Sequence, residues 1–250
     1  MLVRNSGLET RSLIMKYLFP ILVVLTGILL SYALYQALEV APTDQLQGDV
    51  YRIIYYHVPS AWTAFLLFFV NFGASVYYLI KRCEVADIVA LTAAEVGVVF
   101  QTVNLVTGPI WARPVWGIWW TWDLRLTSTL VLWLIYVSYL FLRRFSSSGE
   151  TPLLAAALAI LGALCVPFVY FSIWFFRTQH PQPVIGGGGS MDPRMLHTLL
   201  LNWLAFCCFA SLVCWSRFRL EKLQREVDKA HAMRSLMDEP QEPQGAQDDF

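Results

Sequence analysis

One short stretch of the chain, residues 116–129 with the sequence WGIWWTWDLRLTST, combines flat aromatic side chains with charged ones. Asp123 and Arg125 stand within it, and five tryptophans fall within twelve positions in or just before it: Trp111, Trp116, Trp119, Trp120 and Trp122. An interfacial belt of tryptophans would spread its rings over many helix ends instead. This concentration favours a binding surface for a large, flat, apolar ligand with anionic groups at its edge.

Two of the four histidines lie in segments that flank this stretch: His57 in YRIIYYHVPSAW and His180 in IWFFRTQHPQP. Haem combines a planar macrocycle, two propionates and an iron that takes axial imidazoles, so the two histidines are candidate iron ligands. Arg52 and Arg125 are candidate partners of the propionates, because guanidinium groups pair with carboxylates through two hydrogen bonds. A quinone or a lipid would use the same aromatic surface without needing paired histidines.

We expect residues 115–123 to form a short helix at the membrane surface. In such a helix four side chains stand at positions i, i+3, i+4 and i+7 and share one face: Trp116, Trp119, Trp120 and Asp123. The prediction is a continuous aromatic shelf that is bounded by a carboxylate, with Arg125 about half a turn further on.

The composition indicates that the elements carrying these residues are membrane helices. The chain is 57% hydrophobic and only 14% charged, whereas soluble domains carry about a quarter charged residues. Six apolar stretches approach the ~20 residues that a helix needs to cross a bilayer. They are residues 17–36, 61–80, 87–108, 124–142, 152–174 and 196–216. The predicted fold class is therefore an all-α integral membrane protein, a bundle of six transmembrane helices.

The basic residues predict the orientation of this bundle. Thirteen of the 18 Lys and Arg residues lie before the first stretch, after the sixth, or in the two short even-numbered connections. By the positive-inside rule both termini are cytoplasmic, and the long connections at about 37–60, 109–123 and 175–195 face outward. Both candidate histidines and the tryptophan-rich stretch are then on the outer side, and we expect both histidines to lie outside the membrane spans.

The predicted organisation has three parts. Residues 1–16 form a cytoplasmic N-terminal segment, and residues 17–216 form the membrane domain, with the tryptophan segment at 111–128. Residues 217–250 form a polar cytoplasmic tail whose first part continues the sixth helix and whose end is disordered.

Other features of the sequence bear less directly on binding or catalysis. The five cysteines form no CxxC or zinc-like spacing, so we expect neither disulfides nor thiol chemistry. Glu95, inside the third apolar stretch, should face another helix or a cavity, which leaves both a packing role and a proton path open. The sequence shows no catalytic triad and no nucleotide-binding loop, so any energy from ATP has to come from a partner.

The tryptophan-rich stretch is similar to the WWD motif, W-G-x-W-W-x-W-D-x-R-L-T, of the haem-handling membrane proteins of cytochrome c biogenesis. With its six-helix layout, YRIIYYHVPSAW and a histidine between helices five and six, the chain resembles the CcmC (haem exporter protein C) family over about residues 15–217. The resemblance implies haem b held against the WWD segment at the periplasmic face of the bacterial inner membrane, with His57 and His180 as axial ligands. The motif residues that it assigns to the haem site are Trp116, Trp119, Trp120, Trp122, Asp123 and Arg125.

The same resemblance implies partners. The haem would pass to a haem chaperone, CcmE, which binds it covalently through its own histidine. An ABC transporter of CcmA and CcmB, with the small membrane subunit CcmD, would release the loaded chaperone. The chain is then a binding and transfer component without its own ATPase, and a haem-lyase-like role toward the chaperone is compatible with that. We expect membrane lipid around the helices and no nucleic-acid partner.

Some alternatives stay open. The family's usual W-x-x-L-H-Q-P is replaced here by a segment with Gln179 and Pro181 on either side of His180, which leaves His197 as a rival ligand. A WWD-type haem lyase or synthetase that acts directly on apocytochrome is a second function, although such proteins are typically longer. A permease or a b-type electron-transfer subunit is a third, although cytochromes b ligate haem by histidines inside facing helices.

Overall fold

The structure, a computed structural model, is all-α over the residues that it describes, which are 3–146, 151–176, 178–181 and 191–238. Its six α-helices are α1 (Val3–Tyr35), α2 (Ile54–Lys81), α3 (Glu84–Trp116), α4 (Leu124–Phe145), α5 (Thr151–Phe175) and α6 (Pro193–Asp238). A π-helical turn, η1 (Gln36–Val40), and a 3-10 turn, η2 (Asp49–Ile53), connect α1 to α2. All six helices are long and apolar enough to cross a membrane, which confirms the predicted fold class.

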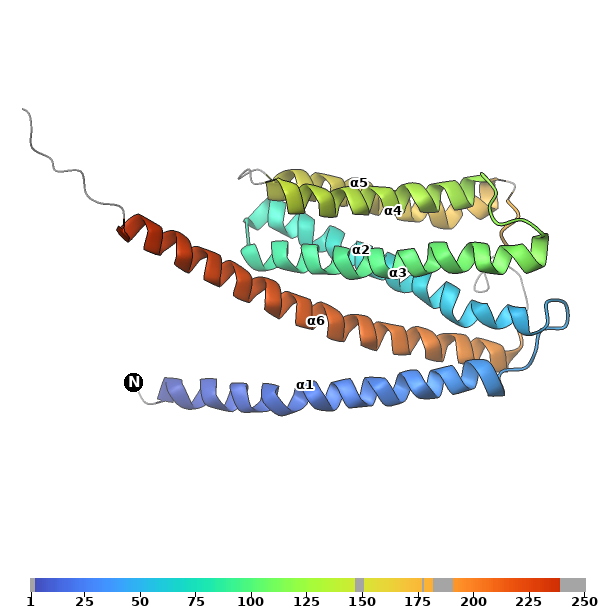
Figure 1. Ribbon diagram of the computed structural model, residues 1–250, viewed down its shortest axis with the longest axis horizontal. Helices are drawn as coiled ribbons and strands as arrows, with labels where there is room; N and C mark the ends of the chain where they lie inside the picture. The colour runs from blue at the N-terminus through green and yellow to red at the C-terminus, as the bar shows by residue number, and fades with distance from the viewer. Residues whose placement is uncertain (1–2, 147–150, 177, 182–190, 239–250) are drawn as a thin grey trace, which may run out of the picture.

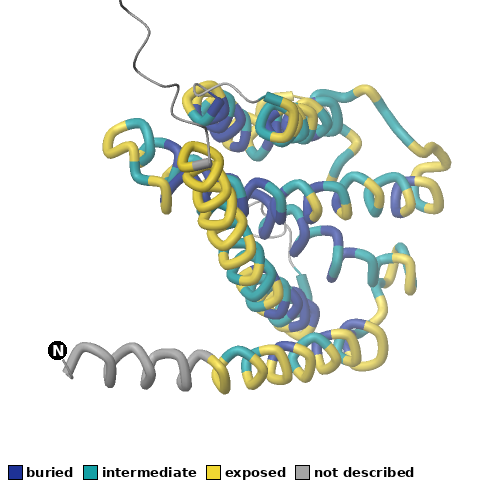
Figure 2. The backbone as a smooth tube through the Cα atoms, turned by 60° about the vertical axis from the view of Figure 1, so that its left-hand side comes forward, coloured by how far each residue is buried: buried dark blue, intermediate teal, exposed yellow. Residues whose placement is uncertain are grey.

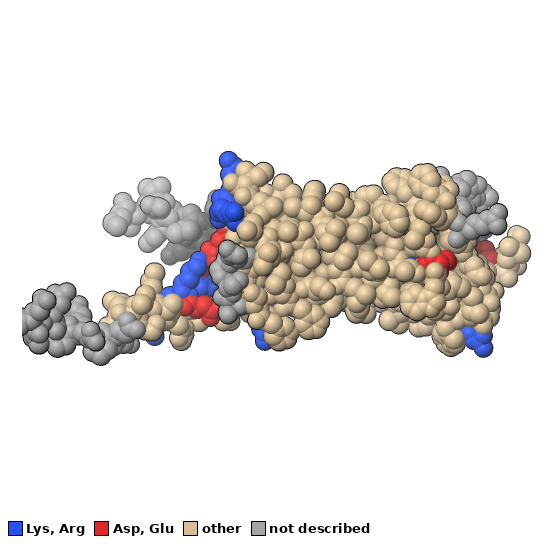
Figure 3. Space-filling model, turned by 90° about the horizontal axis from the view of Figure 1, so that it is seen from above, with Lys and Arg blue, Asp and Glu red and all other residues tan. Residues whose placement is uncertain are grey.

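The helices run alternately in opposite directions along the bundle (Figure 1). The three odd-numbered connections therefore meet at one end, which we call the loop end and which includes residues 36–53, 117–123 and 178–181. The first turn of α1 and the last turn of α6 lie toward the other end. Charged side chains gather at the two ends, and the face between them is uncharged (Figure 3). This distribution suits a bundle that exposes its middle to lipid.

Helix α2 is the centre of the bundle and packs against α3, α5 and α6, whereas α1 lies outside it against α6 (Figure 2). The Phe68 ring on α2 stacks on the Tyr136 ring on α4, with centroids 3.7 Å apart and an interplanar angle of 6°. Glycines make room for both rings. A Cβ at Gly97 would lie 2.7 Å from Phe68 Cε1, and one at Gly162 would lie 2.7 Å from Tyr136 Cε2. The absence of these two side chains lets α3 and α5 approach the stacked pair.

Ion pairs join α3, α4 and α6 at the end opposite the loops. Asp87 accepts hydrogen bonds from Arg143 at 2.5 Å and from Arg225 at 2.7 Å, and its own side chain is 5% exposed. Further along α3, Glu95 pairs with Arg217 of α6 at 2.8 Å. Glu95 therefore faces another helix, as expected, and its arginine partner supports the packing role rather than the proton path. The pair of Asp87 with Arg143 is buried, and such a pair is costly to break because the remaining charge would be left unpaired.

Several helix ends differ from the sequence prediction. Helix α2 begins at Ile54 rather than at residue 61, and α3 continues to Trp116 rather than ending at residue 108. Hydropathy marks where an apolar run begins, but a helix continues into polar residues as long as its backbone stays hydrogen-bonded. Pro59 and Pro109 lie inside these helices, which neighbouring helices tolerate in membrane proteins. Helix α6 continues into the tail as expected; the predicted disordered end, residues 240–250, lies outside the described residues.

The stacking of Phe68 on Tyr136 leads to a prediction about the glycine that lies against the Tyr136 ring. Gly162→Ala should lower the thermal unfolding midpoint in detergent, because the Tyr136 ring is fully buried and has to shift, an overpacking that costs about 1–3 kcal/mol. Gly73→Ala on α2 is the control, since a Cβ there meets nothing within 4 Å. Equal midpoints for the two variants would show that the contact at Gly162 does not limit packing.

Candidate functional site

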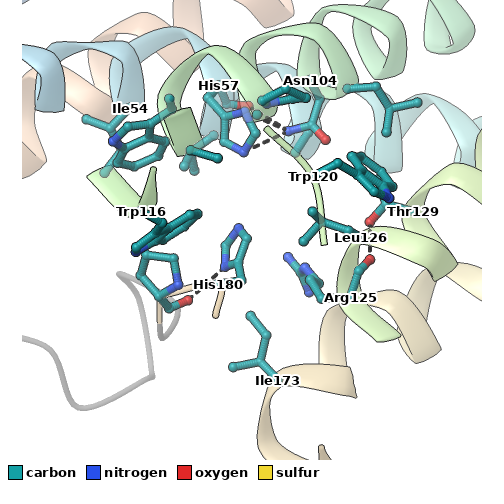
Figure 4. A pocket seen from close by; sticks show the side chains of 18 of the residues that line it. Ile54, His57, Asn104, Trp116, Trp120, Arg125, Leu126, Thr129, Ile173 and His180 are labelled. Carbon is teal, nitrogen blue, oxygen red and sulfur yellow. Dashed lines mark hydrogen bonds between the residues drawn. The ribbon is translucent and has the colours of Figure 1, made fainter. Parts of the chain in front are cut away.

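A cavity opens at the loop end between α2, α3, α4 and α5 (Figure 4). The empty space within it is about 1350 Å³, a volume that includes space open to the surface. Its walls are mostly aromatic and aliphatic, with a few polar side chains among them: His57, Asn104, Arg125, Thr129 and His180. A large apolar pocket with a few convergent polar groups is the usual form of a ligand site.

His57 lies in the first turns of α2 and is 8% exposed. The expectation that it stands outside the membrane spans is therefore wrong, because α2 begins earlier than the hydropathy indicates. Its Nδ1 atom lies 2.9 Å from Thr107 Oγ1 on α3. The Trp111 ring packs edge-on against the imidazole at 5.7 Å between centroids. Helix α3 thus holds one face and one nitrogen of this side chain.

His180 lies in the segment that follows α5, outside the helices, as the sequence predicts. Its Nδ1 atom is 2.8 Å from the main-chain oxygen of Pro181, to which it can donate a hydrogen bond. Burial lowers the pKa of His180 to about 4, and the Arg125 guanidinium nearby adds to this effect. The ring is therefore neutral at neutral pH, and with its hydrogen on Nδ1 it keeps a free lone pair on Nε2.

The two imidazoles face each other across the cavity (Figure 4). Their ring centroids are 6.4 Å apart, and the ring planes are inclined by 34°. Two metal–nitrogen bonds of about 2 Å each, with roughly 1 Å more from each nitrogen to its ring centre, place two centroids about 6 Å apart. The observed separation therefore matches the spacing of two imidazoles that bind one metal ion from opposite sides.

The predicted short helix over residues 115–123 is wrong. Helix α3 itself reaches Trp116 and ends at Gly117, whose φ of 76° is the left-handed conformation typical of a helix C-terminus. Residues 117–123 then run as irregular chain until Asp123 caps α4. Because this segment is not helical, the spacing i, i+3, i+4 and i+7 does not bring its side chains onto one face.

The tryptophans are accordingly divided between two surroundings. Trp111, Trp116 and Trp120 line the cavity. Trp119 and Trp122 lie outside its lining and are 58% and 76% exposed. The shelf predicted from the sequence is therefore smaller than expected, and Trp111, which the prediction left upstream of it, is part of the cavity wall.

Asp123 connects the tryptophan segment to the histidine segment. One carboxylate oxygen accepts a hydrogen bond from the Leu126 main-chain N–H at 2.9 Å and caps α4. The other accepts hydrogen bonds from the Thr178 hydroxyl at 2.7 Å and the Gln179 N–H at 3.4 Å. Burial would raise the pKa of Asp123, but these hydrogen bonds outweigh it and hold the pKa below its usual value. Asp123 does not line the main cavity; it holds the His180 segment and lines a small neighbouring pocket with Trp116 and Trp120.

The two arginines have different surroundings. Arg125 lines the cavity and donates hydrogen bonds to the main-chain oxygens of Val169 and Tyr170. Among the described residues no carboxylate forms an ion pair with it. Arg52 is turned away, with its guanidinium bonded to Asp49 at 3.0 Å and to main-chain oxygens of η1 and of the loop after it. The structure does not place Arg52 in the lining of the cavity, because this side chain is used to fix the connection between α1 and α2.

The structure also settles where the rival histidine lies and adds two polar residues that the sequence analysis did not single out. The rival ligand His197 is exposed on α6 and lies outside the lining of the cavity, so the structure brings His180 and not His197 to His57. Asn104 and Thr107 were missed although both contact His57. The signal was present, since Gln101, Asn104 and Thr107 are polar residues three positions apart in a largely apolar stretch.

Six helices able to cross a membrane, with a ligand cavity at one end, define the chain as a multi-pass membrane protein. Within that class, the chain belongs to the heme exporter protein C family, whose family model (CcmC) matches residues 6–233.

Relatives of the same name are similar over nearly the whole chain. The heme exporter protein C of Bradyrhizobium diazoefficiens is 36% identical over 219 residues, which cover 86% of this chain and 83% of the relative. The heme exporter protein C of Haemophilus influenzae is 31% identical over 227 residues, which cover 90% of this chain and 91% of the relative. The heme exporter protein C of Escherichia coli K12 is 31% identical over 204 residues, which cover 81% of this chain and 83% of the relative.

The contacts of Asp123 predict two separable effects. Thr178→Val should speed amide hydrogen exchange of residues 178–180 and leave the thermal midpoint close to that of the unmodified protein, because Asp123 loses only this hydrogen bond. Asp123→Ala should speed the same exchange and also lower stability by about 0.5–2 kcal/mol, the usual cost of removing a helix N-cap. Unchanged exchange in Thr178→Val would show that Asp123 does not restrain the His180 segment.

Proposed function

We propose that the chain binds haem b in the cavity at the loop end and delivers it for the biogenesis of c-type cytochromes. His57 and His180 are the axial ligands of the iron. The observation that carries this proposal is the 6.4 Å separation of two imidazoles that face each other across an aromatic cavity. Two opposed imidazoles are the ligand set that an iron already held by a macrocycle accepts. The names of the relatives, heme exporter protein C, support the same cargo.

The remaining polar groups of the cavity suit the propionates. The Trp120 indole N–H is buried and has no hydrogen-bond partner among the described residues. Arg125 lies on the same side of the cavity and carries a guanidinium without a carboxylate partner in the described part of the chain (Figure 4). A buried donor without a partner costs about 1–3 kcal/mol, which an acceptor on the ligand would recover. We therefore assign the propionates to Arg125 and Trp120, and the ring faces to Trp111 and Trp116.

The proposed role is transfer. We infer that the loop end is the periplasmic face of a bacterial inner membrane, because the basic residues concentrate at the termini and the even-numbered connections. The acceptor is the haem chaperone CcmE, and the ABC transporter subunits CcmA and CcmB with the small subunit CcmD complete the assembly and supply ATP hydrolysis. Trp119 and Trp122, which are exposed beside the cavity, offer an apolar surface for the acceptor.

Substituting the two ligands tests the proposal directly. His57→Ala and His180→Ala should each convert the six-coordinate haem spectrum of the purified protein into a five-coordinate one, because each removes one axial nitrogen. His197→Ala is the matched control, since that side chain is exposed outside the cavity. Absorption and electron paramagnetic resonance spectra report the change. Unchanged spectra in both histidine variants would contradict the ligand assignment.

The same preparations test delivery. Haem loaded on the unmodified protein should become covalently attached to a histidine of the chaperone when the two are mixed, and the two ligand variants should yield less of this product. Attachment to the cysteine thiols of an apocytochrome instead would favour the haem lyase alternative. Mass spectrometry of the acceptor distinguishes the two products.

The assignment of the propionates predicts a difference between two tryptophans. Trp120→Phe should weaken haem binding by about 10–150-fold, because it removes one hydrogen bond to a charged group, worth roughly 1.5–3 kcal/mol, and keeps an aromatic ring. Trp122→Phe makes the same chemical change outside the cavity and should leave haem affinity unaltered. Titration of each purified protein with haem measures both. Equal losses of haem affinity in Trp120→Phe and Trp122→Phe would show that the Trp120 N–H does not contact the ligand.

A further inference from the structure

Helix α3 carries a row of polar side chains at the height of the cavity. Gln101, Asn104 and Thr107 are three positions apart, so they lie along one side of the helix. Gln101 is fully buried and Asn104 is 8% exposed, although both are in a largely apolar span. Polar groups at such positions are costly unless they serve a partner, and the partner of this row is His57.

The Thr107 hydroxyl determines which nitrogen of His57 carries the hydrogen. It donates to the main-chain oxygen of Val103, at 2.7 Å, one turn earlier in α3. A hydroxyl has one hydrogen, so toward the His57 Nδ1 atom, 2.9 Å away, Thr107 Oγ1 acts as the acceptor. Nδ1 is then the protonated nitrogen, and the lone pair of the ring is on Nε2.

Asn104 holds the backbone that carries this ring. Its Nδ2 atom donates to the main-chain oxygen of His57 at 3.2 Å. The same atom lies 3.4 Å from Nδ1 and 3.3 Å from Nε2, within hydrogen-bonding distance of either nitrogen of the imidazole. Gln101 Nε2 donates to Asn104 Oδ1 at 3.3 Å and fixes the orientation of that amide. Rotation of the imidazole is thereby restricted from the α3 side.

We propose that Thr107 is a positioning residue of the haem site: it holds His57 in the tautomer whose Nε2 faces the cavity, and Asn104 holds the ring in that orientation. The inference rests on the proposed function, because it assigns a task to residues that contact a proposed ligand. A hydrogen bond from the second imidazole nitrogen makes the ligating nitrogen a stronger electron donor, and loss of such a partner typically weakens metal binding by about 10–100-fold. Thr107 therefore affects both the affinity for haem and the electron density at the iron.

The test compares three threonine variants of the full chain loaded with ferric haem b. Thr107→Val keeps the shape of the side chain and removes the acceptor, so it should weaken haem binding by about 10–100-fold. It should also raise the reduction potential of the bound haem, because a less electron-rich imidazole stabilises ferric iron less. Thr107→Ser retains the hydroxyl and should restore both values toward those of the unmodified protein.

Thr92→Val is the matched control. Thr92 is on the same helix and is buried, and its hydroxyl lies 3.0 Å and 3.1 Å from two main-chain oxygens of its own helix, to either of which it can donate. It should change neither the affinity nor the potential. If Thr107→Val behaves like Thr92→Val in both measurements, Thr107 does not position the ligand and the inference is overturned. If Thr107→Val does not insert into the membrane, Thr107→Ala, which adds no bulk, is measured in its place with the same expected shifts.

The His57→Ala background separates this inference from the function on which it depends. If His57→Ala leaves the haem spectrum unchanged, the proposed ligand is wrong and the task assigned to Thr107 falls with it. If His57→Ala changes the spectrum, Thr107→Val should shift the potential only in the protein that retains His57. An equal shift in both backgrounds would show that Thr107 acts on the fold and not through the imidazole.

Discussion

The separation of the His57 and His180 rings is the constraint on which the candidate site depends, and two different parts of the bundle maintain it. His57 is positioned by the packing of α2 on α3, which is close because Gly97 leaves room for Phe68. His180 is positioned by hydrogen bonds between its segment and Asp123, which is also the N-cap of α4. The spacing of 6.4 Å therefore reflects the relative placement of α3 and α4.

The end opposite the loops supports the same placement. Asp87 on α3 pairs with Arg143 on α4 and with Arg225 on α6, so three helices meet at one buried carboxylate. A helix rises about 1.5 Å per residue, and α3 is continuous from Glu84 to Trp116. One rigid element therefore connects the ion pairs at one end of the bundle to the cavity wall at the other. The apolar middle needs only packing, because its backbone hydrogen bonds are made within each helix.

Sequence reasoning located the spans and the histidine pair but misplaced the details that depend on hydrogen bonds. Hydropathy identified all six spans, because it measures the same transfer to lipid that makes them stable. It ended the third span eight residues early, at residue 108, and a periodicity argument then assigned 115–123 to a separate helix. Gly117 and Asp123, a typical C-terminal glycine and a typical N-cap, are the sequence signals for the irregular segment that is found instead. Arg52 was expected beside the ligand, but charge and location do not reveal which oxygens a guanidinium reaches, and in the structure it bonds to main-chain oxygens of η1 and of the loop after it.

The two sides of the cavity differ in mechanical stiffness. His57 belongs to a long helix that has neighbours on three sides, so moving it means shifting packed core residues. His180 stands in irregular chain whose hydrogen bonds to Asp123 are made by two residues, and segments with few such contacts open at low free-energy cost. Thermal motion therefore widens the space between the rings from the α5 side. A bound ligand would be released in a fixed order, losing its attachment to the compliant wall before its attachment to the stiff one.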